Sequence, residues 1–257
     1  MARCSTPRDR PTAGVVVNRD AGADVSERKY RALTAFLLAG KIAGACEDRG
    51  RPVTSDVLLL VGVAAAVVFA AVVLIEGALR PGYDPTYHTG SELALGERGW
   101  IQRANFLLMG VGMLAFAVGV ARTLDSVLGA VLLAIFGVGA IVAGVFVPDP
   151  IRGYPPGARS EPSAQLTWQA QVHDVAGPVM FLALFVACLT LVGRLQGGWQ
   201  LYTALTAVVG LGLTVWTALA YRKDARITGL VQRGLILVYL SWIVVLGIHL
   251  VASPPQA

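Results

Sequence analysis

The sequence predicts an all-α fold, a polytopic membrane protein built as a six-helix transmembrane bundle. Apolar residues make up 55% of the chain and charged residues only 14%, whereas a soluble domain has about 25% charged residues. The apolar residues gather in six long blocks that contain no Asp, Glu, Lys or Arg. A helix of about 20 apolar residues crosses the hydrocarbon core of a bilayer. The alternating pattern of a membrane β-barrel is missing.

The six blocks are the predicted spans. In chain order they are Val57–Ile75, Ala104–Ala121, Ser126–Val147, Val175–Gly193, Leu195–Tyr221 and Gly234–Ala257. The fifth block is longer than a bilayer requires, so its helix is expected to begin near Trp199. Gly and Ala are frequent in the spans, as at Gly137, Gly139 and Gly144, and such small residues let helix backbones approach closely. The spans are therefore expected to form a compact bundle.

The connections between the spans alternate in length. Long polar segments, roughly Gly77–Arg103 and Pro148–Asp174, follow spans 1 and 3, whereas the turns Arg122–Asp125 and Arg194–Gly198 are tight. Because each crossing changes side, both long segments lie on one face of the membrane, together with the turn Arg222–Thr228. An aromatic belt at that face is indicated by Tyr83, Tyr87, Trp100, Tyr154, Trp168, Trp216 and Tyr221.

Residues 1–54 form a predicted basic tail, and residues 55–257 form the six-span domain. The tail carries ten of the 21 Lys and Arg residues against six acidic ones. It is expected to be largely disordered or to lie on the membrane surface, and a short surface helix through Tyr30, Leu33 and Leu37 is one form of the second alternative. Membrane lipids, rather than nucleic acid, are the expected partners of such a tail. Protein partners stay open.

The orientation follows from the positive charge, although two charge patterns disagree. Basic residues favour the cytoplasmic side, so the tail predicts a cytoplasmic N-terminus and places the long loops outside. Charges close to the spans favour the reverse, because the tight turns carry only Arg122 and Arg194. We expect the first orientation, since a 54-residue basic tail without a signal peptide is hard to export. The abundance of Arg, Ala, Gly and Val is typical of a GC-rich bacterial genome, which predicts the plasma membrane as the location.

Ionisable side chains at the membrane edge are costly, so those of the long-loop face are candidate functional residues. They are Glu76, Arg80, Asp84, His88, Glu92, Asp149, His173, Asp174 and Arg233, with Asn105 and Gln232 beside them. One hypothesis is a zinc site held by His88, His173 and Asp149, with Asp84 or Asp174 as alternative carboxylates. An open coordination position would suit the water that hydrolyses a lipid ester or amide. A second hypothesis needs no metal: Arg233 holds a lipid phosphate or carboxylate, and His173 and Asp149 serve as catalytic residues.

Each of these residues also has a purely structural interpretation. Glu76 and Arg80 lie four positions apart and can form an ion pair at a helix end. Asp149 stands between two prolines and can be a turn residue. His173 can mark the start of a helix, and Arg233 can extend to the interface. No HxxxH or HExxH spacing supports the metal hypothesis.

Several motifs at the long-loop face resemble those of a known family. They are Pro81-Gly82-Tyr83-Asp84-Pro85 with His88 and Gly99-Trp100, then Asp149-Pro150 and Gly153-Tyr154-Pro155-Pro156-Gly157 with His173, and finally Gly229-Leu230-Val231-Gln232-Arg233 with Trp242. Over residues 55–251 the chain resembles the bacterial six-span membrane family that is catalogued only as a domain of unknown function, the nine-hundred-and-ninety-eighth of that series. The resemblance implies a six-helix membrane domain and no established activity, substrate or cofactor. Val172 departs from the small or polar residue expected before His173, which weakens the metal hypothesis.

Three functions therefore remain open from the sequence. The first is an integral membrane protein with a polar rim and no assigned activity. The second is a membrane-embedded hydrolase or transferase acting on a lipid, with or without a divalent metal. The third is a non-enzymatic permease or accessory subunit. Ion-coupled transport is disfavoured, because transporters place polar groups near the middle of the bilayer and these spans have few.

Overall fold

The computed structural model describes residues 53–158 and 165–253. All of them belong to the second of the two units into which the chain divides, residues 51–257. The predicted tail, including the surface helix through Tyr30, Leu33 and Leu37, lies outside the described residues except for its last two positions.

Six long helices make up the described unit. They are α2 (Val53–Leu79), α3 (Gly99–Leu124), α4 (Val127–Val145), α5 (Trp168–Val192), α6 (Gly198–Arg222) and α7 (Thr228–Ala252), with a short 3-10 helix η1 (Glu92–Ala94) between α2 and α3. All six are long and apolar enough to cross a bilayer. Within residues 53–158 and 165–253 no strand of a sheet occurs. The predicted six-span bundle is confirmed, and α6 begins at Gly198, next to the expected start at Trp199.

The helices differ from the predicted spans mainly at their polar ends. α2 continues past Ile75 and includes Glu76, and α7 begins at Thr228 rather than Gly234. α5 begins at Trp168, so His173 lies in its second turn and does not mark its start. The predicted spans end early because each was defined as a block without charged residues, which stops at the first charged residue. A helix continues past such a residue when the surrounding loops supply its hydrogen-bond partners.

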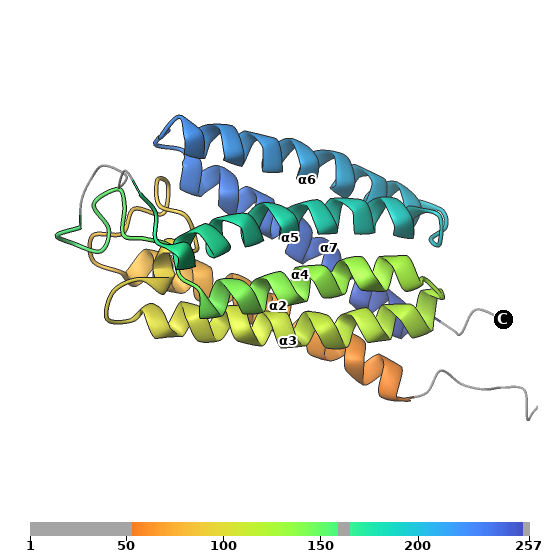
Figure 1. The fold of residues 1–257 in the computed structure, drawn as a ribbon. Helices are drawn as coiled ribbons and strands as arrows, with labels where there is room; N and C mark the ends of the chain where they lie inside the picture. Colours follow the sequence, from red (N-terminus) through yellow and green to blue (C-terminus); the bar gives the residue numbers. More distant parts are fainter. Residues whose placement is uncertain (1–52, 159–164, 254–257) are drawn as a thin grey trace, which may run out of the picture. The chain divides into compact units, whose positions relative to one another are not determined.

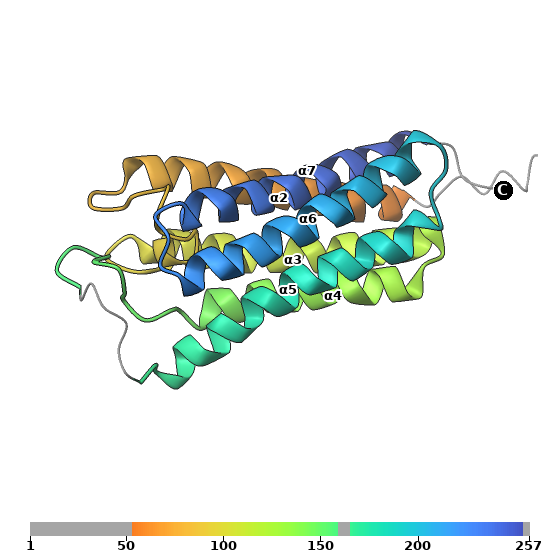
Figure 2. The ribbon, with the colours of Figure 1, turned by 90° about the horizontal axis from the view of Figure 1, so that it is seen from above.

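The helices are arranged as a ring (Figures 1 and 2). Each helix packs against its neighbours in the chain, and α7 packs against α2, which closes the ring. Loop 1 (residues 80–98), the described parts of loop 2 (residues 146–158 and 165–167) and the α6–α7 turn all lie at one end, and the two tight turns lie at the other (Figure 1). We call the first end the loop end. The predicted shared face of the long connections is therefore observed.

Close helix packing rests on glycine, as expected for a membrane bundle. A Cβ atom on Gly110 of α3 would lie 2.6 Å from the carbonyl oxygen of Gly137 in α4, and one on Gly137 would lie 2.9 Å from that of Gly110. The interior is filled by large side chains such as Met113, Phe116 and Trp242, each fully buried. Many Leu, Ile and Val side chains stay exposed on the outside of the ring, where lipid is the solvent.

Candidate functional site

Loop 1 is fastened to α7 by Arg233. Its Nη1 group donates to the carbonyl oxygens of Pro85 (2.6 Å), His88 (3.0 Å) and Gly229 (3.0 Å), and its Nη2 group donates to the hydroxyl of Tyr83 (2.5 Å). The backbone of α7 can come this close because Gly229 has no side chain: a Cβ there would lie 2.3 Å from the His88 carbonyl oxygen. Arg233 is buried and does not extend to the interface. Its guanidinium is occupied by loop 1, which leaves little of it for a phosphate.

Tyr83 continues this network into the loop. Its hydroxyl donates to the carbonyl oxygen of Thr89 at 2.8 Å. Burial raises the pKa of Tyr83 to about 12, against the opposing effect of the Arg233 charge, so the phenol stays protonated. Tyr83 and Tyr154 are both buried between the loops, whereas Trp100 and Trp168 are exposed. The predicted aromatic belt thus includes the tryptophans but not these two tyrosines.

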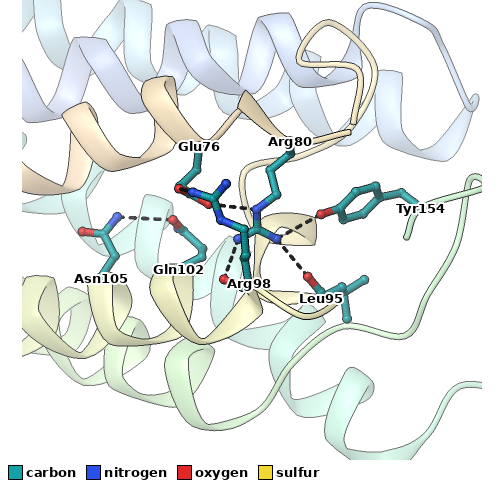
Figure 3. Close-up of polar contacts among 7 residues, drawn as sticks. All are labelled: Glu76, Arg80, Leu95, Arg98, Gln102, Asn105 and Tyr154. Carbon is teal, nitrogen blue, oxygen red and sulfur yellow. Dashed lines mark hydrogen bonds and ion pairs between the residues drawn. The ribbon is translucent and has the colours of Figure 1, made fainter. Parts of the chain in front are cut away.

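A second buried arginine, Arg80, ties the end of α2 to both loops (Figure 3). Its Nε group donates to Glu76 at 2.8 Å, and its Nη1 group donates to the carbonyl oxygen of Leu95 and the hydroxyl of Tyr154, both at 3.0 Å. Its Nη2 group donates to the carbonyl oxygen of Arg98 at 2.6 Å. Arg98 also pairs with Glu76 through its own guanidinium. The predicted Glu76–Arg80 ion pair is confirmed, and it is part of a larger network.

Two further buried polar side chains, Gln102 and Asn105, lie on α3 (Figure 3). Asn105 donates from Nδ2 to the carbonyl oxygen of Phe69 in α2 at 3.2 Å and to Oε1 of Gln102 at 3.3 Å. The first of these bonds joins α3 to α2. Nε2 of Gln102 and Oδ1 of Asn105 have no hydrogen-bond partner among the described residues.

His88 has a structural role that uses both ring nitrogens. Nδ1 accepts a hydrogen bond of 2.8 Å from the backbone N–H of Asp84, and Nε2 lies 3.1 Å from the carbonyl oxygen of Arg152. An N–H can only donate and a carbonyl can only accept, so the neutral ring carries its proton on Nε2. A metal would have to displace one of these bonds.

Arg152 of loop 2 joins four segments at the loop end. Its carbonyl meets His88, its Nη1 group donates to the carbonyl oxygen of Tyr87 (3.4 Å), and its Nη2 group donates to that of Tyr221 (3.2 Å). Its Nε lies 3.1 Å from Asp224 Oδ1 in the α6–α7 turn. Arg152 was not among the predicted site residues, because its partners are distant in the chain.

Asp149 and His173 fix the junction of loop 2 with α5. The carboxylate of Asp149 accepts from the backbone N–H (2.8 Å) and the hydroxyl (2.7 Å) of Thr167, the N-cap residue of α5. His173 donates from Nδ1 to the carbonyl oxygen of Phe146 at 2.8 Å. The neutral ring therefore keeps its lone pair on Nε2.

The predicted metal ligands do not come together. Among residues 53–158 and 165–253, no group of three or more His, Cys, Asp and Glu side chains is placed to hold a metal ion. His88, His173 and Asp149 each bond to backbone or side-chain groups of their own loop junctions. The zinc hypothesis stays a prediction that this arrangement does not support.

A cavity of about 280 Å³ lies at the loop end, between α5, α6, α7 and the two loops. Its polar lining includes Glu92, His173, Asp174, Thr217, Arg222 and Gln232. A smaller apolar cavity of about 90 Å³ lies among side chains such as Phe106, Phe136, Met180 and Leu184. The two cavities adjoin, because both are lined by Ser91, His173, Gly177, Phe181 and Gln232. We call them the outer and the inner cavity.

Glu92 is the most unusual polar group of the outer cavity. Its side chain folds back so that Oε2 accepts from the backbone N–H (2.5 Å) and the hydroxyl (3.0 Å) of Thr89. The other oxygen, Oε1, is buried and has no hydrogen-bond partner among the described residues. Burial raises the pKa of the Glu92 carboxyl, while the Thr89 bonds and the positive charge of Arg152 oppose the shift. Glu92 was predicted to lie at the rim but was not among the predicted site residues. The Thr-x-x-Glu spacing of a capping box was the signal for its folded-back position.

Six apolar helices with a shared polar end define this chain as a multi-pass integral membrane protein. It belongs to the DUF998 family, described as proteins of unknown function, whose family model matches residues 63–249. The resemblance seen in the loop motifs is thereby confirmed. Comparisons with curated proteins and with solved structures find no match.

Proposed function

We propose that this protein binds an amphiphilic molecule at its loop end, with the polar head in the outer cavity and the apolar chain in the inner one. The observation that carries the proposal is the junction of the two cavities. Five residues line both, so a chamber that carries several polar groups adjoins an apolar one inside the ring. Binding sites combine an apolar lining with a few placed polar groups in this way.

The geometry favours binding over the predicted lipid hydrolysis. Of the three residues predicted to be catalytic, only His173 lines the outer cavity. Asp149 is bonded to Thr167, and Arg233 is bonded to the backbone of loop 1. A non-enzymatic binding protein therefore fits the site better than a hydrolase.

Gly177 offers a way to test the proposal. It lines both cavities, and a Cβ at this position would meet no atom within 4 Å. Gly177→Leu should therefore fill the junction without disturbing the fold. Gly212→Leu in α6 is the matched control, because a Cβ there also meets nothing within 4 Å.

The measurement is photo-crosslinking of the purified full chain with a dodecyl amphiphile that carries a diazirine near the end of its chain. We expect label on inner-cavity residues such as Met180 and Leu184, competed by unlabelled amphiphile, lost in Gly177→Leu and kept in Gly212→Leu. Label confined to lipid-facing residues such as Val138 and Val175, and equal in both variants, would contradict the proposal.

We further propose that the protein lies in a bacterial plasma membrane with its N-terminus in the cytoplasm, so that the loop end faces outward. The basic tail supports this orientation. Fusions of alkaline phosphatase and of a fluorescent protein to each end of the chain test it. Fluorescence at both ends is expected, and phosphatase activity at both ends would reverse the placement of the cavity.

A further inference from the structure

The lining of the outer cavity includes a buried carboxyl group with one oxygen that has no hydrogen-bond donor among the described residues. Glu92 is 1% exposed, and its Oε1 atom faces no donor among the described residues. Pro178, which also lines the cavity, has no N–H to donate to the carbonyl of Asp174, so that oxygen lacks its helical bond from residue 178. This carbonyl on α5 is a second acceptor beside the Glu92 oxygen on loop 1.

The walls also carry donors, which include the hydroxyl groups of Ser91 and Tyr221 and the guanidinium of Arg222. Gln232 uses Oε1 to accept from the backbone N–H of Gly90 at 2.7 Å, which leaves its NH₂ group as a donor. The hydroxyl of Thr217 is buried without a partner among the described residues and can act either way. Both of these groups are neutral.

The charges point in the same direction. Two carboxyl groups face the cavity, Glu92 from loop 1 and Asp174 from α5, against one cation, Arg222 at the exposed end of α6. The carboxyl group of Glu92 is buried, whereas the guanidinium of Arg222 lies at the exposed end of α6. A negatively charged head would have to approach the buried carboxyl, and while that carboxyl is ionised, like charges at short range in a low dielectric repel strongly.

We infer that the amphiphile bound here has a head group that donates hydrogen bonds and is not anionic, such as an ammonium or a hydroxyl group. Glu92 Oε1 accepts a hydrogen bond from that head group. This inference rests on the proposed function and names the class of its ligand. Within residues 53–158 and 165–253, Glu92 Oε1 is the one buried carboxyl oxygen without a hydrogen-bond partner, and a donor in that place would satisfy it. Selectivity for donors is greatest at such a position.

The test compares heads on one chain length. Dodecylamine, monolaurin, dodecyltrimethylammonium, laurate and dodecyl phosphate compete with the photo-crosslinking probe for the wild-type protein. We expect dodecylamine and monolaurin to compete at least tenfold more strongly than laurate and dodecyl phosphate. Dodecyltrimethylammonium separates hydrogen bonding from charge, because it is a cation without an N–H, and it should compete weakly.

Glu92→Gln places an NH₂ group where Oε1 stands and should reduce the preference for donor heads at least tenfold. Glu97→Gln is the control, since Glu97 is an exposed acid of the same loop. Equal competition by amine and phosphate in the wild-type protein would overturn the inference whether or not Glu92→Gln folds. If that result came with labelling that Gly177→Leu still abolishes, the binding proposal would stand without the inference. Failure of cavity labelling itself would remove both.

Discussion

Arg233 and Tyr83 lie 150 positions apart in the chain, and Nη2 of the arginine donates a hydrogen bond of 2.5 Å to the phenol oxygen of the tyrosine. Both side chains are buried, each 7% exposed. Together with the three carbonyl bonds of Nη1, this contact makes loop 1 part of the helix bundle rather than a free connection. The cavity proposed to bind an amphiphile therefore has a fixed wall.

Arg233→Lys should destabilise the protein, because an ammonium group cannot reproduce the planar fork that reaches both Tyr83 and the loop carbonyls. Leaving these acceptors unpaired should lower the free energy of unfolding by about 2–3 kcal/mol. Thermal unfolding in detergent, followed by tryptophan fluorescence, measures the loss. Arg222→Lys, at an exposed arginine, is the control. Equal melting temperatures for the two variants would contradict the role of Arg233 in holding loop 1 against α7.

Gly229→Ala should be strongly destabilising, since the new Cβ would lie 2.3 Å from the carbonyl oxygen of His88. Forcing loop 1 away from α7 should cost about 3 kcal/mol. Gly234→Ala, five positions along the same helix, is the matched control because its Cβ meets nothing within 4 Å. That variant should be as stable as the wild type or more so, given the better helix propensity of alanine. If both variants melted alike, the close approach of loop 1 would be wrong.

His88→Ala should lower the free energy of unfolding by about 2 kcal/mol, because it leaves the Asp84 N–H and the Arg152 carbonyl unpaired. This loss should be the same with and without a chelator, and the zinc content of the purified protein should not differ between His88→Ala, His173→Ala and wild type. Stoichiometric zinc that disappears in both variants would instead support the predicted metal site.

Glu92 should make the stability of the protein depend on pH. Its pKa is raised in the folded protein above the ordinary value of 4.5, so the folded state binds this proton more tightly than the unfolded chain. The resulting stabilisation is fully present below about pH 4.5 and is lost as the pH rises through the raised pKa. Relative to Glu92→Gln, the melting temperature of the wild type should fall as the pH rises above about 4.5. A difference that stays constant over this range, or one that Glu97→Gln also removes, would contradict the assignment.

The membrane spans could be predicted because uninterrupted apolar blocks have no other stable state in lipid. Their ends could not, since α5 and α7 continue through His173 and Arg233, whose partners are residues such as Phe146 and Pro85 in distant loops. A block of sequence carries no information about which loop will cover its polar end. The same reason explains why the arrangement of the helices as a ring was not foreseen.

The sequence predicted the end of the bundle at which the candidate site lies, but not which side chains form it. Its face of the membrane followed from the alternating lengths of the connections. His88 and Asp149 nevertheless proved to hold the loops in place, and Glu92 proved to be the buried carboxyl with an open oxygen. Whether a polar loop residue holds the loop in place or presents a free group to a cavity depends on how it is buried. The burial of a loop residue depends on contacts that a single sequence does not reveal.

The closing contact of the ring, between α2 and α7, has a consequence for how the molecule is made. The other five helix pairs with the most extensive packing are neighbours in the chain, so a ribosome that delivers the helices one by one supplies each with a partner already inserted. The contact between α2 and α7 can form only after α7 has been made. The same holds for the contacts of loop 1 with Arg233 and Gln232, which are translated more than a hundred residues after the loop. During synthesis, therefore, the wall of the outer cavity is the last part of the molecule to become ordered.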